Sequence, residues 1–142
     1  MRFAIVGAGA VGGFYGALLA RAGHDVSFVA RGAHRDAINR DGLKILSGPE
    51  AVGEIVVRCP AHSDPAAIGP VDVVIIAIKT YSNADTFPTL APLVGPGTSI
   101  LTLQNGVDSA EELAAVFGEA AVIGGATYIA AGIEAQIGRA HV

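Results

Sequence analysis

A glycine-rich turn near the N-terminus constrains the fold of this chain more than any other feature. The apolar residues 3–6 predict a buried strand, and Gly7-Ala8-Gly9-Ala10-Val11-Gly12 follows with the spacing Gly-x-Gly-x-x-Gly. Residues 14–22 then predict a helix and residues 25–30 a second strand. In such a unit the first glycine permits a tight turn, the second lets the backbone approach a pyrophosphate, and the third lets the helix pack on the strand. The helix N-terminus offers N–H groups and a partial positive charge to the phosphates. Residues 7–12 therefore predict a dinucleotide site, the alternative being a packing site without a ligand.

The rest of the chain alternates patterns typical of strands and helices. Residues 71–78 are nearly continuously apolar and β-branched, which favours a central parallel strand covered on both faces. The other predicted elements are a short helix around residues 37–38, a helix over 83–93 with Pro88 near its start or kinking it, a strand over 99–103 after the turn 95–97, a helix over 110–117 capped by Asp108 or Ser109, and a last strand over 121–129. This alternation predicts an α/β fold, a Rossmann-like doubly wound parallel sheet in a single domain.

One segment departs from the alternation. Residues 43–46 and 54–58 are short and rich in apolar and β-branched residues, and a breaker at residues 47–49 separates them. They predict a short antiparallel excursion around residues 43–58. Residues 60–70 predict a loop with a helical turn at residues 65–67.

Composition narrows the class of protein and its partners. With 142 residues and 51% hydrophobic content, the chain is long and apolar enough for one buried core. A net charge of −4 without a basic run argues against nucleic-acid binding.

The apolar residues 120–133 are broken by glycines and are shorter than the ~20 residues that span a bilayer. A signal-peptide interpretation of the N-terminus conflicts with its glycine spacing. The single Cys59 fits a reducing compartment, so we expect a soluble cytoplasmic protein without a membrane partner.

Arg31 follows the second predicted strand and bears on the choice of cofactor. Sites that prefer NAD usually carry Asp or Glu about 20 residues beyond the glycines, where it accepts from the ribose hydroxyls. No acidic residue occurs between Val26 and Arg35, and an arginine offers a charged fork to a 2′-phosphate. The sequence therefore favours NADP(H) over NAD, and His34 or Arg35 could share the role. The alternative is an ordinary surface arginine.

Two further polar residues follow predicted strands. Lys79 is the only cation between Val71 and Thr98, and its ammonium group could contact a cofactor sugar or a substrate carboxylate. Asn105 can donate and accept hydrogen bonds at once, which suits a ribose or substrate oxygen. Both also have ordinary interpretations, as a solvated lysine and an Asn-Gly turn.

No other catalytic or metal-binding arrangement is readable. The four histidines are scattered along the chain, and Cys59 has no ligand-spaced partner, so we expect no metal site. No Ser–His–acid arrangement is recognisable, and the tyrosine hydroxyls are better explained by packing.

Five segments together resemble the N-terminal domain of the ketopantoate reductase (2-dehydropantoate 2-reductase) family. They run in order along almost the whole chain: Gly7-Ala8-Gly9-Ala10-Val11-Gly12, Val29-Ala30-Arg31-Gly32, His34 with Gly42-Leu43-Lys44-Ile45, Ile78-Lys79-Thr80-Tyr81, and Leu103-Gln104-Asn105-Gly106-Val107. The Lys-Thr-Tyr and Gln-Asn-Gly segments are more specific than the glycine motif.

The resemblance implies an NADPH-dependent oxidoreductase that reduces a 2-keto acid, in this family 2-dehydropantoate to pantoate on the route to pantothenate and coenzyme A. It implies that Arg31 binds the 2′-phosphate, that Lys79 lies at the cofactor near the substrate, that Asn105 bridges cofactor and substrate, and that the backbone of Ala131 touches the nicotinamide end. Lys79 and Asn105 are thus the candidate substrate-binding residues.

The resemblance also implies what residues 1–142 lack. In the family a second, helical domain carries the lysine that protonates the reduced carbonyl, so we expect no catalytic residue in this chain, which should bind NADP(H) without turnover. The face toward that domain would be apolar and allows a homodimer. Residues 133–142 depart from the family's usual proline-glycine pattern. Two alternatives stay open: a same-family reductase of another 2-keto acid, and a regulatory nucleotide-binding module of the potassium-transport type. The latter class normally ends its second strand in an acid, where this chain has Arg31.

Overall fold

The computed structural model of the protein describes residues 1–45, 54–104, 108–125, 132–135 and 139–141, the last two segments by their backbone alone. Its strands are β1 Arg2–Val6, β2 Asp25–Val29, β3 Leu43–Ile45, β4 Ile55–Val57, β5 Ala61–His62, β6 Val71–Ile76, β7 Val94–Thr102, β8 Val122–Gly124, β9 Gly132–Ala135 and β10 Arg139–His141. Its helices are α1 Ala10–Arg21, α2 Gly32–Asp41, α3 Asn83–Thr86 and α4 Ser109–Phe117, with the 3-10 turns η1 Pro65–Ala67, η2 Thr80–Ser82, η3 Phe87–Leu93 and η4 Glu119–Ala121.

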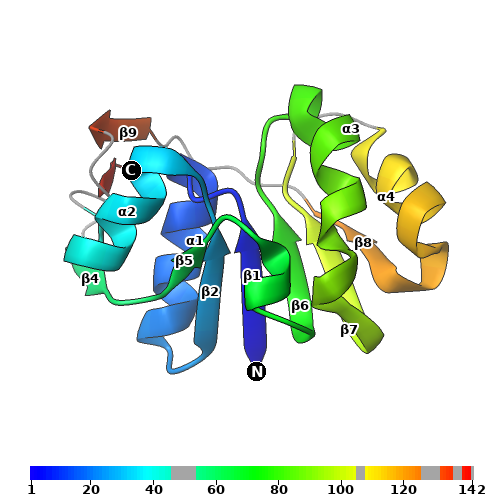
Figure 1. Cartoon of the computed structure of the whole chain (residues 1–142), viewed down its shortest axis with the longest axis horizontal. Coiled ribbons are helices and arrows are strands. Elements are labelled where there is room, and N and C mark those ends of the chain that lie inside the picture. Colours follow the sequence, from blue (N-terminus) through cyan, green and yellow to red (C-terminus); the bar gives the residue numbers. More distant parts are fainter. Residues whose placement is uncertain (46–53, 105–107, 126–131, 136–138, 142) are drawn as a thin grey trace.

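A six-stranded parallel sheet forms the centre of the fold, in the order β5-β2-β1-β6-β7-β8 (Figure 1). From β1 the chain runs outward through β2 to β5, and from β6 it runs outward on the other side through β7 to β8. The order therefore reverses between β1 and β6, where Ile5 lies beside Ile75. In open α/β sheets ligands bind beyond the carboxyl ends of the strands at this point of reversal. The predicted doubly wound parallel sheet is confirmed.

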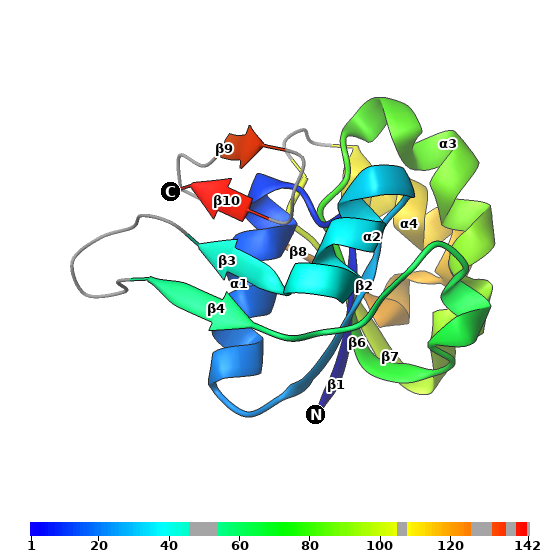
Figure 2. The ribbon, with the colours of Figure 1, turned by 60° about the vertical axis from the view of Figure 1, so that its left-hand side comes forward.

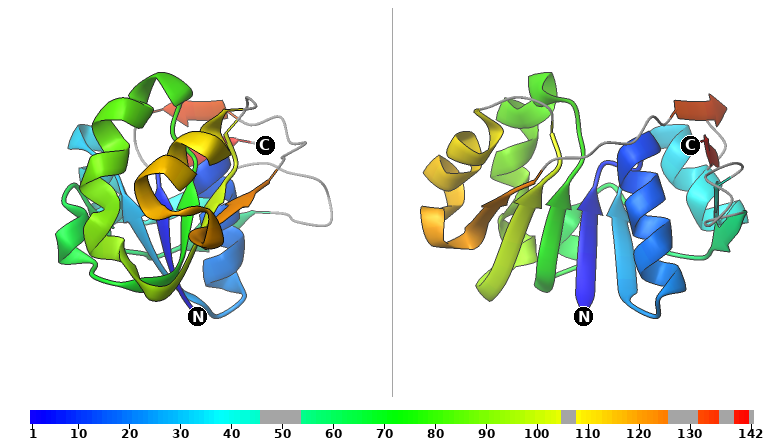
Figure 3. Two further views of the ribbon diagram at one scale, coloured as in Figure 1. Left: turned by 90° about the vertical axis from the view of Figure 1, so that its right-hand side faces the viewer. Right: turned by 180° about the vertical axis from the view of Figure 1, so that it is seen from behind.

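Strand β1 is buried on both faces. Its alternate residues point to opposite sides of the sheet, and each side is covered. Ile5 packs with Phe14 of α1 in one apolar cluster. Val6 packs with Leu90 of η3 in a second cluster on the opposite face. Figure 3 shows α1 covering the face seen from behind, with α3, η3 and α4 on the other side of the sheet. The near-continuous apolar sequences of β1 and β6 reflect this double coverage.

Helix α1 is enclosed by two sheets. Its far side meets a second, four-stranded sheet in the order β4-β3-β10-β9 (Figure 2). This enclosure explains why small and apolar residues surround the helix axis instead of lining one stripe. A Cβ on Gly16 would lie 2.5 Å from Cζ of Phe28, so only glycine allows α1 to lie this close to β2. The predicted third-glycine packing thus has a second contributor one turn along the helix.

The predicted antiparallel excursion is confirmed by β3 and β4. Leu43 lies opposite Val57 in an antiparallel pair, and Gly42 enters the pair with a φ of +81°. The predicted breaker at residues 47–49 lies outside the described residues. Strands β9 and β10 extend this sheet, with β10 parallel to β3. The sequence did not predict them, because they are short and pair only through tertiary contacts.

The predicted helix over residues 83–93 is present with these bounds, but most of it is not α-helical. Only Asn83–Thr86 is α-helical, and Phe87–Leu93 continues as a 3-10 helix. Pro88 stands in the first turn of this 3-10 segment and Pro92 inside it. Proline has no N–H to donate, so two prolines so close together break the i to i−4 hydrogen-bond ladder.

The prediction of a continuous loop over residues 60–70 is wrong at one point. Ala61–His62 forms the edge strand β5 beside β2. Asn39 of α2 then pairs with the outer side of Ala61: its Nδ2 donates to the Ala61 carbonyl at 2.9 Å and its Oδ1 accepts from the Ala61 N–H at 2.8 Å. A side chain from another element thus completes this edge, which no local pattern reveals. The predicted turn at Pro65–Ala67 is confirmed as η1.

The predicted turn at residues 95–97 lies within β7. Val71 pairs with Val94 and Val73 with Ser99, so the register shifts and the intervening residues of β7 form an irregularity. Thr98 closes it, because its Oγ1 accepts from the Gly95 N–H at 2.9 Å and donates to the Val71 carbonyl at 2.6 Å.

Several element ends differ from the predicted bounds. Helix α1 begins at Ala10, before the predicted residue 14, and α2 extends over Gly32–Asp41 where only a short helix is predicted. Strand β6 ends at Ile76, two residues early. Asp108 occupies the N-cap of α4, but its side chain makes no capping hydrogen bond. Strand β8 ends at Gly124, and residues 126–129 of the predicted last strand lie outside the described residues.

Within the described segments, no helix is both long enough and apolar enough to cross a membrane.

Candidate dinucleotide site

The glycine turn lies at the carboxyl end of β1, where the strand order reverses. Gly7 takes a φ of +99°, which a residue with a side chain rarely adopts, and its N–H donates to the Val29 carbonyl of β2 at 3.1 Å. The turn ends at Gly9, which is the N-cap of α1. The predicted strand–turn–helix is therefore present, with the turn anchored to β2.

Each glycine of the motif occupies a different environment. A Cβ on Gly7 would lie 2.9 Å from Cγ2 of Ile78, and one on Gly12 would lie 1.9 Å from the Gly7 carbonyl oxygen. A Cβ on Gly9 would meet nothing within 4 Å. Gly7 and Gly12 are thus required by the chain itself, whereas the space beside Gly9 is open. An open backbone surface at a helix N-terminus is what a pyrophosphate requires.

The N-terminus of α1 is suited to an anion. No acidic residue occupies its first turn, and no side chain caps it. The first N–H groups of an α-helix have no partner within the helix, and the macrodipole adds a partial positive charge there. Residues 9–12 therefore offer hydrogen-bond donors to a ligand phosphate.

His34 of α2 holds the turn from the outside. Its Nε2 is hydrogen-bonded to the Ala8 carbonyl oxygen, and because that oxygen only accepts, Nε2 carries the proton. In a trans peptide the carbonyl and the following N–H point in opposite directions. His34 therefore turns the Gly9 N–H away from α2. The sequence suggested that His34 could share the role of Arg31. The structure places it against the glycine turn and in the wall of the hollow that Arg31 lines, and a shared role stays a prediction.

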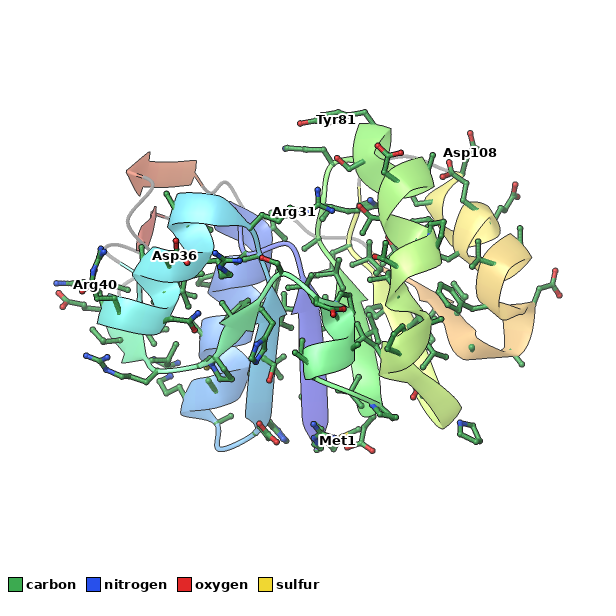
Figure 4. The ribbon with its side chains drawn as sticks, viewed as in Figure 1. Met1, Arg31, Asp36, Arg40, Tyr81 and Asp108 are labelled. Atoms are coloured by element: carbon green, nitrogen blue, oxygen red, sulfur yellow. The ribbon has the colours of Figure 1, made fainter. Side chains whose placement is uncertain are left out.

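Arg31 stands at the carboxyl end of β2 as the N-cap of α2 (Figure 4). It lines a hollow of about 290 Å³ together with Gly7, Ala8 and His34. The opposite wall comes from residues 78–86 and includes Asp85. Among the described residues, the Arg31 side chain has no hydrogen-bond or ion-pair partner, so its guanidinium group is available to a ligand. The hollow adjoins the glycine turn on the β2 side.

Arg35, the other cation of this region, is already engaged. Its Nε donates to Oδ1 of Asp36 at 2.9 Å, and its NH1 group donates to Ser63 Oγ. The hydroxyl of Ser63 in turn donates to the Ala30 carbonyl. These bonds tie α2 to the segment after β5 and support the end of β2, beside Arg31.

Lys79 lies on the other side of the turn. It is exposed and lines a hollow of about 170 Å³ with Val11, Thr80, Tyr81 and Gln104. Ile78 lines both hollows, so the two adjoin across the glycine turn. The structure thus places the glycine turn between two hollows, one with Arg31 and the other with Lys79. A dinucleotide has the matching form, two nucleosides joined by a pyrophosphate.

The structure also shows two buried polar residues that the sequence did not predict to be functional. Asn83 and Gln104 are 2% and 8% exposed and are hydrogen-bonded to each other beside Lys79. Gln104 belongs to the Gln-Asn-Gly segment, and that segment was the only signal. Asn105 and Ala131 lie outside the described residues. Among the described residues, no group of His, Cys, Asp and Glu is arranged to hold a metal ion.

The reversed strand order, the glycine turn and the helix N-terminus together define a Rossmann-like domain of the dinucleotide-binding class. The family model described as ketopantoate reductase PanE/ApbA matches residues 3–142. The chain therefore belongs to the ketopantoate reductase family, as its motifs predict.

Individual relatives agree with this assignment. The 2-dehydropantoate 2-reductase of Mesorhizobium japonicum is 43% identical over 109 residues, 75% of this chain and 32% of that protein. The protein of the same name from a Nostoc species is 36% identical over 129 residues, 90% of this chain and 39% of that protein. The crystal structure of 2-dehydropantoate 2-reductase from Geobacter metallireducens has a TM-score of 0.90 and 41% identity, covering 99% of this chain and 46% of that one.

The chain spans less than half the length of each of these relatives. The alternative of a potassium-transport regulatory module has no support among the matches.

Proposed function

We propose that this chain binds NADPH and forms the cofactor-binding part of a 2-keto acid reductase, whose substrate is 2-dehydropantoate and whose product is pantoate. The observation that carries the proposal is the arrangement of Arg31, the open backbone at Gly9 and Lys79 along one edge of the sheet. The names of the relatives support the choice of reaction.

Different residues of the site bind different parts of the cofactor. The N–H groups of residues 9–12 bind the pyrophosphate, and the space beside Gly9 admits it. Arg31 binds the 2′-phosphate as a bidentate donor. The acidic residue of an NAD-specific site would repel this phosphate. When bound, NADPH supplies a hydride to the substrate. Lys79 lies where it can bind the ribose of the nicotinamide half or a substrate carboxylate.

The remaining roles belong to residues that the resemblance names. Asn105 contacts both cofactor and substrate, and the Ala131 backbone contacts the nicotinamide. The proton donor to the carbonyl oxygen lies outside residues 1–142, so the chain binds NADPH without turnover. A cytoplasmic location is part of the proposal, since the single Cys59 is buried as a free thiol.

Calorimetry with NADPH and NADH tests the cofactor assignment. Wild-type protein should bind NADPH more tightly than NADH, and Arg31→Ala should weaken NADPH binding about ten- to a hundredfold, because a charged hydrogen bond contributes roughly 1.5–3 kcal/mol. NADH binding should change little.

Arg40→Ala is the matched control. Arg40 lies at the opposite end of α2 and pairs with Asp41 at 2.8 Å, so its removal changes the net charge equally without touching the hollow (Figure 4). Equal wild-type affinity for the two cofactors would refute the NADP assignment. Turnover of 2-dehydropantoate by the 142-residue chain would refute the external proton donor.

A further inference from the structure

The segment that carries Lys79 is held at its base by two buried amides. Gln104 follows the end of β7, and Asn83 begins α3. Gln104 Nε2 donates to Asn83 Oδ1 at 2.6 Å, and Asn83 Nδ2 donates to Gln104 Oε1 at 3.3 Å. The two amides therefore form a closed pair.

Each amide uses its second N–H outside the pair. Gln104 Nε2 donates to the Ile78 carbonyl at 3.0 Å, and Asn83 Nδ2 donates to Oε2 of Glu112 on α4 at 3.1 Å. All four N–H bonds of the two amides thus have acceptors. Flipping either amide would place like groups against each other, so the network determines both orientations.

The network holds both ends of residues 79–82. Ile78 immediately precedes this segment and Asn83 immediately follows it, and the side chain of Gln104 binds both. Within the segment, the Ser82 N–H donates to the Lys79 carbonyl at 3.0 Å. Lys79, Thr80 and Tyr81 are exposed, and the Tyr81 side chain is 85% exposed, so few contacts besides this base restrain the segment. Figure 4 shows Tyr81 projecting from the molecule at this point.

We propose that Gln104, Asn83 and Glu112 form a positioning network that holds residues 79–82 in the conformation that receives the nicotinamide half of the cofactor. The inference rests on the proposed function for the identity of that ligand. Gln104 lines the hollow of Lys79 but not that of Arg31. The network acts by ordering the segment before binding, so the ligand does not bear that entropic cost. Lys79, Thr80 and Tyr81 line the hollow of Lys79, whereas Ser82 is the one residue of the segment that lines the hollow of Arg31, so the larger effect falls on the nicotinamide half of the dinucleotide.

Two ligands separate the halves. Adenosine 2′,5′-bisphosphate probes the hollow of Arg31 alone, whereas NADPH engages both hollows. Gln104→Met keeps the length of the side chain and removes every hydrogen bond of its amide. It should weaken NADPH binding about tenfold, which corresponds to a segment ordered about a tenth of the time. Binding of adenosine 2′,5′-bisphosphate should change less than about twofold.

Substitutions on the exposed first turn of α4 avoid the risk of misfolding. Glu112→Ala removes one acceptor and should weaken NADPH binding about threefold, whereas Glu112→Gln keeps an acceptor oxygen and should restore it. Glu111→Ala is the matched control, because Glu111 is exposed in the same turn and lies outside the network. It removes the same helix-dipole contribution as Glu112→Ala.

Trypsin supplies a readout that needs no ligand. Cleavage after the exposed Lys79 should accelerate about tenfold in Gln104→Met, while cleavage after Arg40 in α2 stays constant. Equal weakening of both ligands, or faster cleavage at both sites, would show a general structural role and overturn the inference.

The inference and the proposed function fail differently. Unchanged cleavage at Lys79 in Gln104→Met would overturn the network's hold on the segment even if the wild type binds NADPH. A wild type that binds neither ligand would overturn the proposed function and the assigned ligand, whatever the cleavage pattern.

Discussion

Two single-methyl additions within the glycine turn should separate ligand binding from folding. Gly9→Ala places a Cβ in the open space where the pyrophosphate is proposed to bind, and nothing in the chain lies within 4 Å of it. Gly9 has φ −73° and ψ −162°, a conformation that alanine adopts without strain. Gly12→Ala places a Cβ 1.9 Å from the Gly7 carbonyl oxygen and 3.1 Å from Cβ of Ala77. One change therefore affects the ligand surface and the other the protein interior.

The stability changes follow from these environments. Alanine at residue 9 restricts the unfolded chain, which stabilises the folded protein by about 0.4–1 kcal/mol. Alanine is also a poorer N-cap than glycine, which destabilises the protein by a similar amount. Gly9→Ala should therefore leave the free energy of unfolding within about 1 kcal/mol of wild type. In Gly12→Ala the turn and α1 must separate by about 1 Å, and overpacking against rigid backbone costs about 3 kcal/mol. Alanine has a helix propensity about 1 kcal/mol more favourable than glycine, so the free energy of unfolding should fall by about 2 kcal/mol in total.

The assay pairs thermal denaturation with calorimetry. Gly12→Ala should melt roughly 5–10 °C below wild type. Gly9→Ala should melt near wild type yet bind NADPH at least about tenfold more weakly, a loss of about 1.4 kcal/mol. Undiminished NADPH binding by Gly9→Ala would refute the assigned pyrophosphate position. A wild-type melting temperature for Gly12→Ala would refute the packing argument.

Two further predictions concern the core. Gly16→Ala should destabilise the protein by about 1–3 kcal/mol, because its Cβ would lie 2.5 Å from the buried ring of Phe28. In urea denaturation, this loss of stability should be smaller when Phe28→Leu is also present. Strictly additive effects of the two substitutions would contradict the contact. Burial, assisted by the negative charge of Asp25, raises the pKa of the Cys59 thiol. Above the unfolded pKa of about 8.5 the folded state then binds more protons than the unfolded state, so stability should fall as the pH rises through this range. Urea midpoints between pH 7 and pH 10 measure this, and Cys59→Ser, which does not titrate there, should lack the decline.

The fold was largely predictable where local pattern and tertiary role coincide. Strands β1 and β6 have apolar sequences because both their faces are buried, and the glycines of the turn are required by contacts a few residues away. Strand β5 was missed because its two residues are held by β2 and by Asn39, which lie elsewhere in the chain. The helix over residues 83–93 was predicted with the correct bounds, but its 3-10 form after Thr86 was not, because Pro88 and Pro92 lack the N–H groups that an α-helix needs.

The candidate site shows the same division. Arg31 and Lys79 were identified from their positions after strands, and the structure places them at two adjoining hollows. The contact of His34 with Ala8 and the pairing of Gln104 with Asn83 join residues 21 or more positions apart. A single sequence carries no record of such a pairing. The roles of Asn105 and Ala131, and the homodimer, stay predictions.

The sequence by itself determined the class of the fold and the location of the candidate ligand site. It could do so because a strand, a glycine turn and a helix N-terminus are consecutive in the chain, and their chemistry depends on local backbone geometry. Tertiary structure alone decided which side chains support that site. Open space beside Gly9, the hold of His34 on the turn and the amide network beneath Lys79 arise only when separate elements meet at one edge of the sheet. Such contacts depend on distances between elements, and residue order does not specify those distances.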